Sequence, residues 1–133
     1  MLDGDEQPSA VKASEAFRDR AIPQFWDGDK KLGHEVARSL GAEGWTAWDI
    51  YLFYPPGAEW TDKGMPAPEA ALAQAGGVVI GTKGLLPAGD ASRLPKRLRE
   101  RLGDRIDVVG EQSDLEVLLS RVAVPFAKRY AEP

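Results

Sequence analysis

The stretch Trp48-Asp49-Ile50-Tyr51-Leu52-Phe53-Tyr54, followed by Pro55-Pro56-Gly57, decides the fold that the sequence predicts. Aromatic and β-branched residues dominate this stretch, and such a composition favours a β-strand. The two prolines cannot continue a hydrogen-bonded ladder, so the strand should end there. Because both sets of alternating side chains are largely apolar, we expect layers to cover both faces, with Trp48, Tyr51 and Phe53 in the core.

Two further strands and several helices are predicted around this stretch. Apolar β-branched runs indicate strands at 78–80 and 106–109. Capping residues and apolar periodicity indicate helices at 9–20, 29–40, 92–102 and from 113 onward, the last kinked or shortened by Pro125. Gly41 favours a left-handed stop for the second of these helices. The apolar stripe of the last helix is formed by Leu115, Leu118, Leu119, Val122 and Phe126. The alanine-rich stretch after Pro66 is also expected to form a short helix, which Gly76-Gly77 would end.

The order of these elements predicts an α/β fold. A strand, a helix and a strand in succession favour a parallel, right-handed βαβ unit. We therefore expect one α/β domain over residues 9–133, built on a small three-stranded, mainly parallel sheet with helices on both faces. Residues 1–8 are expected to form a flexible N-terminal segment.

Composition excludes several classes of function. The chain has 133 residues, 17 basic and 21 acidic side chains, and a net charge of −4. This balance argues against a nucleic-acid partner or an anionic membrane. The lack of cysteine excludes disulfides, zinc–thiolate sites and thiol catalysis. Without a long apolar run, we expect no membrane insertion and a soluble protein, either cytoplasmic or extracytoplasmic after removal of a leader.

A candidate site is predicted at the carboxyl ends of the three strands, where open parallel sheets bind ligands. The loops in question are 55–62, 81–84 and 110–113, and the third leads into a helix N-terminus that favours an anion. The candidate ligand-binding residues are Glu59, Trp60, Asp62, Thr82, Lys83, Glu111, Gln112 and Ser113. The alternative interpretation is that these loops are ordinary turns and caps.

Three shorter motifs point to structural roles. The loop Gly81-Thr82-Lys83-Gly84 lacks the longer glycine frame of a phosphate-binding loop, so a solvated turn is favoured. Asp27-Gly28-Asp29 lacks the following oxygen ligands of a calcium loop, so capping of the next helix by Asp27 or Asp29 is favoured and no metal is predicted. The single histidine, His34, is expected to be solvated and has no recognisable triad context.

Other residues leave two interpretations open. Asp49 is expected at the edge of the sheet, accepting a hydrogen bond from a neighbouring loop, or else in a functional site. Trp26 and Trp60 lie in predicted loops, where core packing and ligand contact are equally compatible with the sequence. The basic helix 93–101 is expected to present a solvated outer face rather than a phosphate or nucleic-acid site.

These observations predict a non-catalytic α/β binding or interaction module. Its partner would be a small anionic molecule or a protein, engaged at the carboxyl-end loops without a cofactor. The alternative is a small enzyme acting on an anionic substrate, with Lys83 as the electrostatic anchor and Glu59, Asp62 or Glu111 as acid or base. The module is preferred because no nucleophile–base pattern is visible in the sequence.

Overall fold

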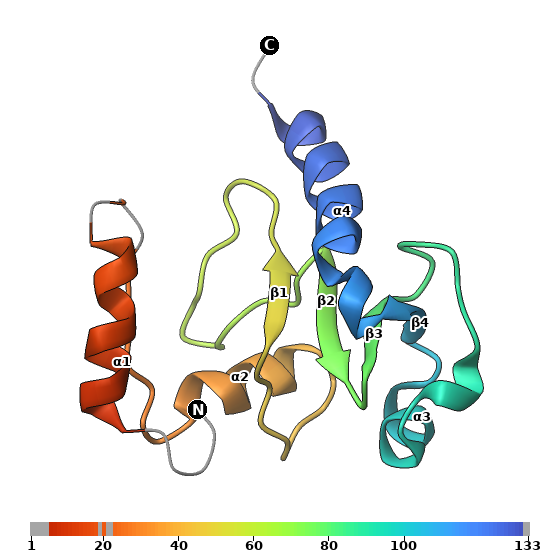
Figure 1. Cartoon of the computed structure of the whole chain (residues 1–133), viewed down its shortest axis with the longest axis horizontal. Helices are drawn as coiled ribbons and strands as arrows, with labels where there is room; N and C mark the ends of the chain where they lie inside the picture. The colour runs from red at the N-terminus through yellow and green to blue at the C-terminus, as the bar shows by residue number, and fades with distance from the viewer. Residues whose placement is uncertain (1–5, 19, 21–22, 132–133) are drawn as a thin grey trace.

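The computed structural model describes residues 6–18, 20 and 23–131, and its centre is a four-stranded sheet. The strands are β1 (Ile50–Phe53), β2 (Ala70–Ala75), β3 (Val78–Thr82) and β4 (Ile106–Glu111). They lie in the order β1-β2-β3-β4, and every neighbouring pair is antiparallel (Figure 1). The predicted three-stranded, mainly parallel sheet is therefore wrong.

The first reason for the error is the alanine-rich stretch, which forms β2 instead of the predicted helix. Gly76 and Gly77 both have positive φ, 59° and 83°, and they form the two-residue loop between β2 and β3. Such loops suit a tight hairpin because their twist matches that of the strands. Pairing on both sides, with β1 and with β3, outweighs the high helix propensity of alanine.

The second reason is the connection between β3 and β4. Leu94 packs against Val78 at the start of β3, so the chain has already run back along the sheet before α3 (Lys96–Leu102) begins. The helix then returns the chain to the other end, where Ile106 pairs with Thr82. Because the loop makes one passage and α3 makes a second, β4 must run antiparallel to β3 rather than completing a parallel crossover.

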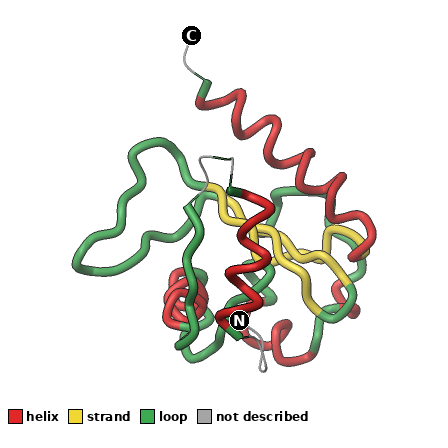
Figure 2. The backbone as a smooth tube through the Cα atoms, turned by 60° about the vertical axis from the view of Figure 1, so that its left-hand side comes forward, coloured by secondary structure: helices red, strands yellow, loops and turns green. Residues whose placement is uncertain are grey.

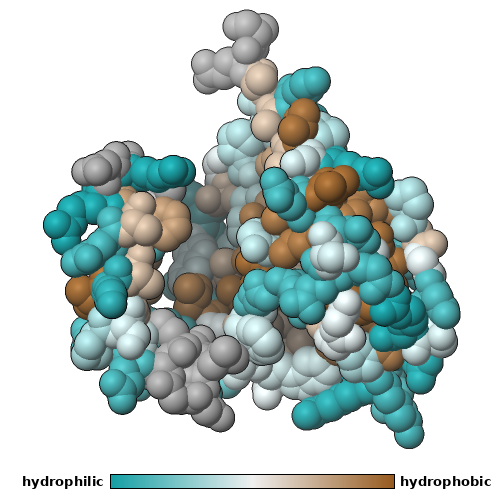
Figure 3. Space-filling view, in the orientation of Figure 1, coloured by the Kyte–Doolittle hydropathy of each residue, from teal (hydrophilic) through white to brown (hydrophobic). Residues whose placement is uncertain are grey.

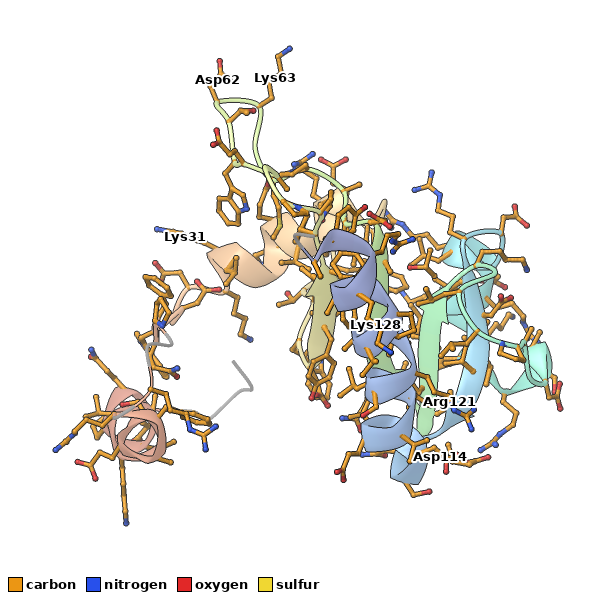
Figure 4. All side chains as sticks on the ribbon, turned by 90° about the horizontal axis from the view of Figure 1, so that it is seen from above. Lys31, Asp62, Lys63, Asp114, Arg121 and Lys128 are labelled. Atoms are coloured by element: carbon orange, nitrogen blue, oxygen red, sulfur yellow. The ribbon has the colours of Figure 1, made fainter. Side chains whose placement is uncertain are left out.

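Three further helices complete the chain, together with short 3₁₀ turns. They are α1 (Gln7–Ser14), α2 (Lys31–Ser39) and α4 (Leu115–Tyr130), with turns η1 (Glu15–Phe17), η2 (Ala91–Arg93) and η3 (Gln112–Asp114). Residues 1–5 of the predicted flexible segment and residue 19 of the predicted first helix lie outside the described residues. Helix α1 has no buried residue and lies apart from the sheet in both Figure 1 and Figure 4.

Helix α4 covers one face of the sheet. Leu118 and Val122 are buried against Leu72 and Val79, and the apolar stripe predicted for this helix is confirmed. Pro125 lies inside the helix, which continues to Tyr130, so the predicted shortening is wrong. In Figure 2 the C-terminal part of α4 projects beyond the strands. Figure 3, which views the α4 side, shows hydrophobic patches within a largely hydrophilic surface.

The opposite face of the sheet meets α3 and the segment that follows α2. Two small clusters form there, one around Leu102, Ala37 and Ala42 and the other around Val78, Leu94 and Val108. Figure 4 shows α2 on the side of the sheet opposite α4. Of the two predicted capping residues, Asp27 and Asp29, it is Asp27 that caps α2. Its carboxylate accepts the N–H groups of residues 31–33 at 2.8–3.3 Å.

Strand β1 differs from the prediction because it is an edge strand. Trp48 is 54% exposed and Tyr51 is 38% exposed, so only Phe53 of the three predicted core aromatics packs against the buried cluster. Asp49 has a φ of 54°, which breaks the extended backbone and leaves Trp48 outside the strand. Its carboxylate accepts a hydrogen bond from the side chain of Gln74 at 2.6 Å, from β2 rather than from a loop.

Within the described part of the chain, no helix is both long and apolar enough to cross a membrane.

Candidate functional site

The antiparallel sheet divides the predicted site between its two ends. Thr82 lies where β1 ends and β4 begins, and its hydroxyl accepts the Ala71 N–H at 2.9 Å. Glu111 instead pairs with Val78, at the other end of β3. Four residues of strand separate these ends by roughly 13 Å. Figure 4, which looks roughly along the strands, shows that Asp62 and Asp114 also lie on opposite sides of the molecule.

Loop 54–69 carries three of the predicted residues, Glu59, Trp60 and Asp62, all of them exposed. Trp60 is 58% exposed, so of its two interpretations the structure excludes core packing. Lys83 forms an ion pair with Asp107 at 3.2 Å beside Thr82, while Gln112 and Ser113 lie with Glu111. Ligand binding by these eight residues stays a prediction. Their grouping as one site assumed a parallel sheet, and in the antiparallel sheet they lie at its two ends.

Two residues assigned to the enzyme alternative already have partners. The carboxylate of Glu111 is bound by the guanidinium of Arg93. The pKa of Asp107, the partner of Lys83, is lowered by the hydrogen bond from the Gly84 N–H and by Lys83 itself. Among the described residues, no group of three or more acidic, histidine or cysteine side chains could hold a metal ion.

A different site emerges on the face of the sheet opposite α4. A cleft of about 490 Å³ lies between β2, the end of α2, the segment 45–48 and α3. We call it the alanine cleft, after Ala71, Ala73 and Ala75, which line it from alternate positions of β2. Its volume falls within the range of roughly 300–1,000 Å³ that is usual for small-molecule sites.

The small side chains of β2 explain why the cleft is open. Ala73 pairs with Ile50 on one side and Ile80 on the other, and both isoleucines also line the cleft. Strand positions on a covered face are usually filled by larger β-branched or aromatic residues. With only a methyl group at each alanine, the space between the sheet and α3 is left unfilled.

Trp45 forms one wall of the cleft, and two arginine side chains stack on its ring. The guanidinium groups of Arg97 and Arg101 lie 5.0 and 5.5 Å from its ring centroid, a geometry typical of cation–π contact. Its indole Nε1 is buried and has no hydrogen-bond partner among the described residues. A buried donor without a partner is uncommon, because the lost hydration is not replaced.

The return arm of loop 54–69 closes another side of the cleft through Ala67 and Pro68. Two side chains of α2 hold this arm: the Glu35 carboxylate accepts the Met65 N–H at 2.6 Å, and Arg38 donates to the Met65 carbonyl at 3.1 Å. Hydrogen bonds from Arg38 and from Met65 lower the pKa of Glu35 to about 2. The loop is therefore fastened to α2 by a carboxylate that stays ionised near neutral pH.

The chemistry of the lining favours binding over acid–base catalysis. Arg105 is the only charged side chain among the described residues that line the alanine cleft. Two of the polar side chains there are already engaged, because Thr82 accepts the Ala71 N–H and Gln74 donates to Asp49. His34 lies outside the lining and is exposed, with Nδ1 3.0 Å from the Trp45 carbonyl oxygen.

The candidate ligand-binding residues chosen from the sequence include Thr82 but leave out Trp45, the β2 alanines and Arg105. One signal was available: two apolar runs separated by Gly-Gly are typical of a β-hairpin. That interpretation would have made the alanines alternate between the two faces of a sheet. No sequence pattern marked Arg105 as a site residue. It lies at the cleft because α3, which precedes it, packs on that face of the sheet.

Comparisons with protein-family models, with curated proteins and with solved structures found no match, so the candidate site rests on its own geometry.

Proposed function

We propose that this chain is a non-catalytic binding module that takes up a small, largely apolar molecule in the alanine cleft. The observation that carries the proposal is a cleft of about 490 Å³ whose lining is mostly aliphatic and aromatic, with few polar groups. Small-molecule sites typically combine such a lining with a few placed polar side chains that orient the ligand.

The strand that forms the floor supports this assignment. Three alanines at alternate positions leave space that a packed core would fill, and cavities without an occupant generally cost stability. Trp45 and Trp48 add flat aromatic surfaces beside that floor. No observation favours the enzyme alternative, since Lys83 is in an ion pair with Asp107.

The test uses N-phenyl-1-naphthylamine, a neutral probe whose fluorescence rises in apolar surroundings. We expect saturable binding in the range of roughly 1–100 µM, as for a modest ligand in a partly open apolar site. The variant Ala73→Leu should fill the floor and weaken binding by at least about tenfold, with thermal stability kept or raised.

Ala127→Leu is the matched control, because Ala127 is exposed on α4 and does not line the cleft. It should bind the probe like the wild type. If Ala73→Leu is too unstable to assay, Ala75→Val makes a smaller change on the same face. Absence of saturable binding to the wild-type protein would overturn the proposed function, as would equal binding by the floor variants and the wild type.

A further inference from the structure

We propose that the ligand of the alanine cleft is an amphiphilic acid, with its apolar body on the β2 alanines and its anionic head bound by Arg105. This inference rests on the proposed binding function and adds the chemical class of the ligand. It depends on Arg105, the only charged side chain among the described residues that line the cleft.

Arg105 is an exposed residue that lines the cleft just before β4. Its backbone is engaged, with the N–H donating to Leu102 and the carbonyl accepting from Lys83. Its guanidinium, by contrast, has no hydrogen bond or ion pair with any described residue. That group lies against Gly41, where a Cβ atom would collide with it. A glycine at this turn thus leaves room for the guanidinium beside the cleft.

Two other arginines add positive charge on the same side. Arg97, Arg101 and Arg105 recur at four-residue intervals, and the first two stack on Trp45, which is itself part of the cleft wall. The neighbouring acids Glu43 and Asp104 form no ion pair with them in the described structure. Unneutralised charge beside an apolar cleft attracts anions and concentrates them there.

The charge of Arg105 supplies the reason for an acid. A carboxylate is an acceptor-only group with two oxygens, and it pairs well with a guanidinium donor. An apolar body alone would leave the Arg105 guanidinium without an acceptor. A cationic head would meet the like charge of Arg105, the only charged side chain among the described residues that line the cleft. An amphiphilic acid is therefore the class that complements both the floor and Arg105.

The experiment measures displacement of bound N-phenyl-1-naphthylamine by decanoate and by decanamide, its neutral counterpart, below the concentrations at which either aggregates. We expect decanoate to compete about tenfold better, the effect of one charge-assisted contact at a partly exposed position. The advantage should shrink as salt is raised, because the head lies where ions can screen it. Arg105→Gln should abolish the advantage and leave decanamide unaffected.

Arg99→Gln is the matched control, because Arg99 is exposed on α3, just before Arg105 in the chain, but does not line the cleft. This variant should keep the preference for decanoate. Equal competition by the acid and the amide, or an equal loss in both arginine variants, would overturn the proposed ligand class while probe binding still supported the binding function. Failure of the probe to bind the wild-type protein would instead remove the binding function itself.

Discussion

Replacing Gly110 of β4 with alanine should destabilise the protein, chiefly through its closest contact, which is with α4. A Cβ atom at this position would lie 2.8 Å from Cδ1 of Leu118, well inside normal contact distance. Gly110 has no positive φ, so the alanine backbone is not strained. Leu118 is only 4% exposed and is packed among other core side chains, so it has little room to move away.

The expected magnitude follows from two opposing effects. Overpacking a core costs about 1–3 kcal/mol, whereas replacing glycine by alanine gains about 0.4–1 kcal/mol by restricting the unfolded chain. A net loss of about 1–2 kcal/mol is expected for Gly110→Ala. Leu118→Ala should cost about 2–5 kcal/mol, because it removes buried surface and leaves a cavity.

The informative result comes from the double variant, measured by equilibrium urea unfolding. The methyl group at position 110 would then enter the space that Leu118 has left. The free energies of unfolding should be non-additive, with the double variant more stable than the sum of the single changes by at least about 1 kcal/mol. Additivity within about 0.5 kcal/mol would refute the close packing of β4 against this part of α4.

Two further predictions concern α2. Gly33→Ala should lower the free energy of unfolding by about 1–3 kcal/mol, despite the higher helix propensity of alanine. The reason is that the new Cβ atom would lie 2.8 Å from the Ala47 carbonyl oxygen. A variant that is more stable than the wild type in thermal unfolding would contradict this packing. Since the pKa of Glu35 falls from 4.5 to about 2 on folding, its stabilisation is full above pH 4.5 and is lost as the pH drops toward 2. The unfolding midpoint of the wild type should therefore exceed that of Glu35→Gln at pH 6 and converge with it near pH 2, and a gap that stays constant with pH would argue against the Glu35–Met65 contact.

Features set by local periodicity were predictable from the sequence. Helix α4 was found from its apolar stripe, and Leu118 and Val122 are buried as expected. The position of β3 and the left-handed stop of α2 at Gly41 were also found. Each of these depends on residues one or two turns apart, or on a single glycine, so the neighbouring sequence contains the information.

The direction of β4 and the identity of β2 were decided by tertiary contacts. The stretch 70–75 has the composition of a helix, but pairing with β1 and β3 on either side makes it a strand. Leu94 packs at the start of β3, and this contact reverses the chain before α3 and makes β4 antiparallel. Neither effect can be read from a window of ten residues, because both depend on partners elsewhere in the chain.

The same distinction applies to the candidate site. The sequence by itself determined the composition that limits the chemistry: no cysteine, one histidine and a small acidic excess. It also determined that polar loops follow the strands. Only the tertiary structure separated Glu111 from Thr82 and brought Trp45, Ala73 and Arg105 around one cleft. The physical reason is that a cleft is space left between elements, and its lining is set by how those elements pack rather than by their order in the chain.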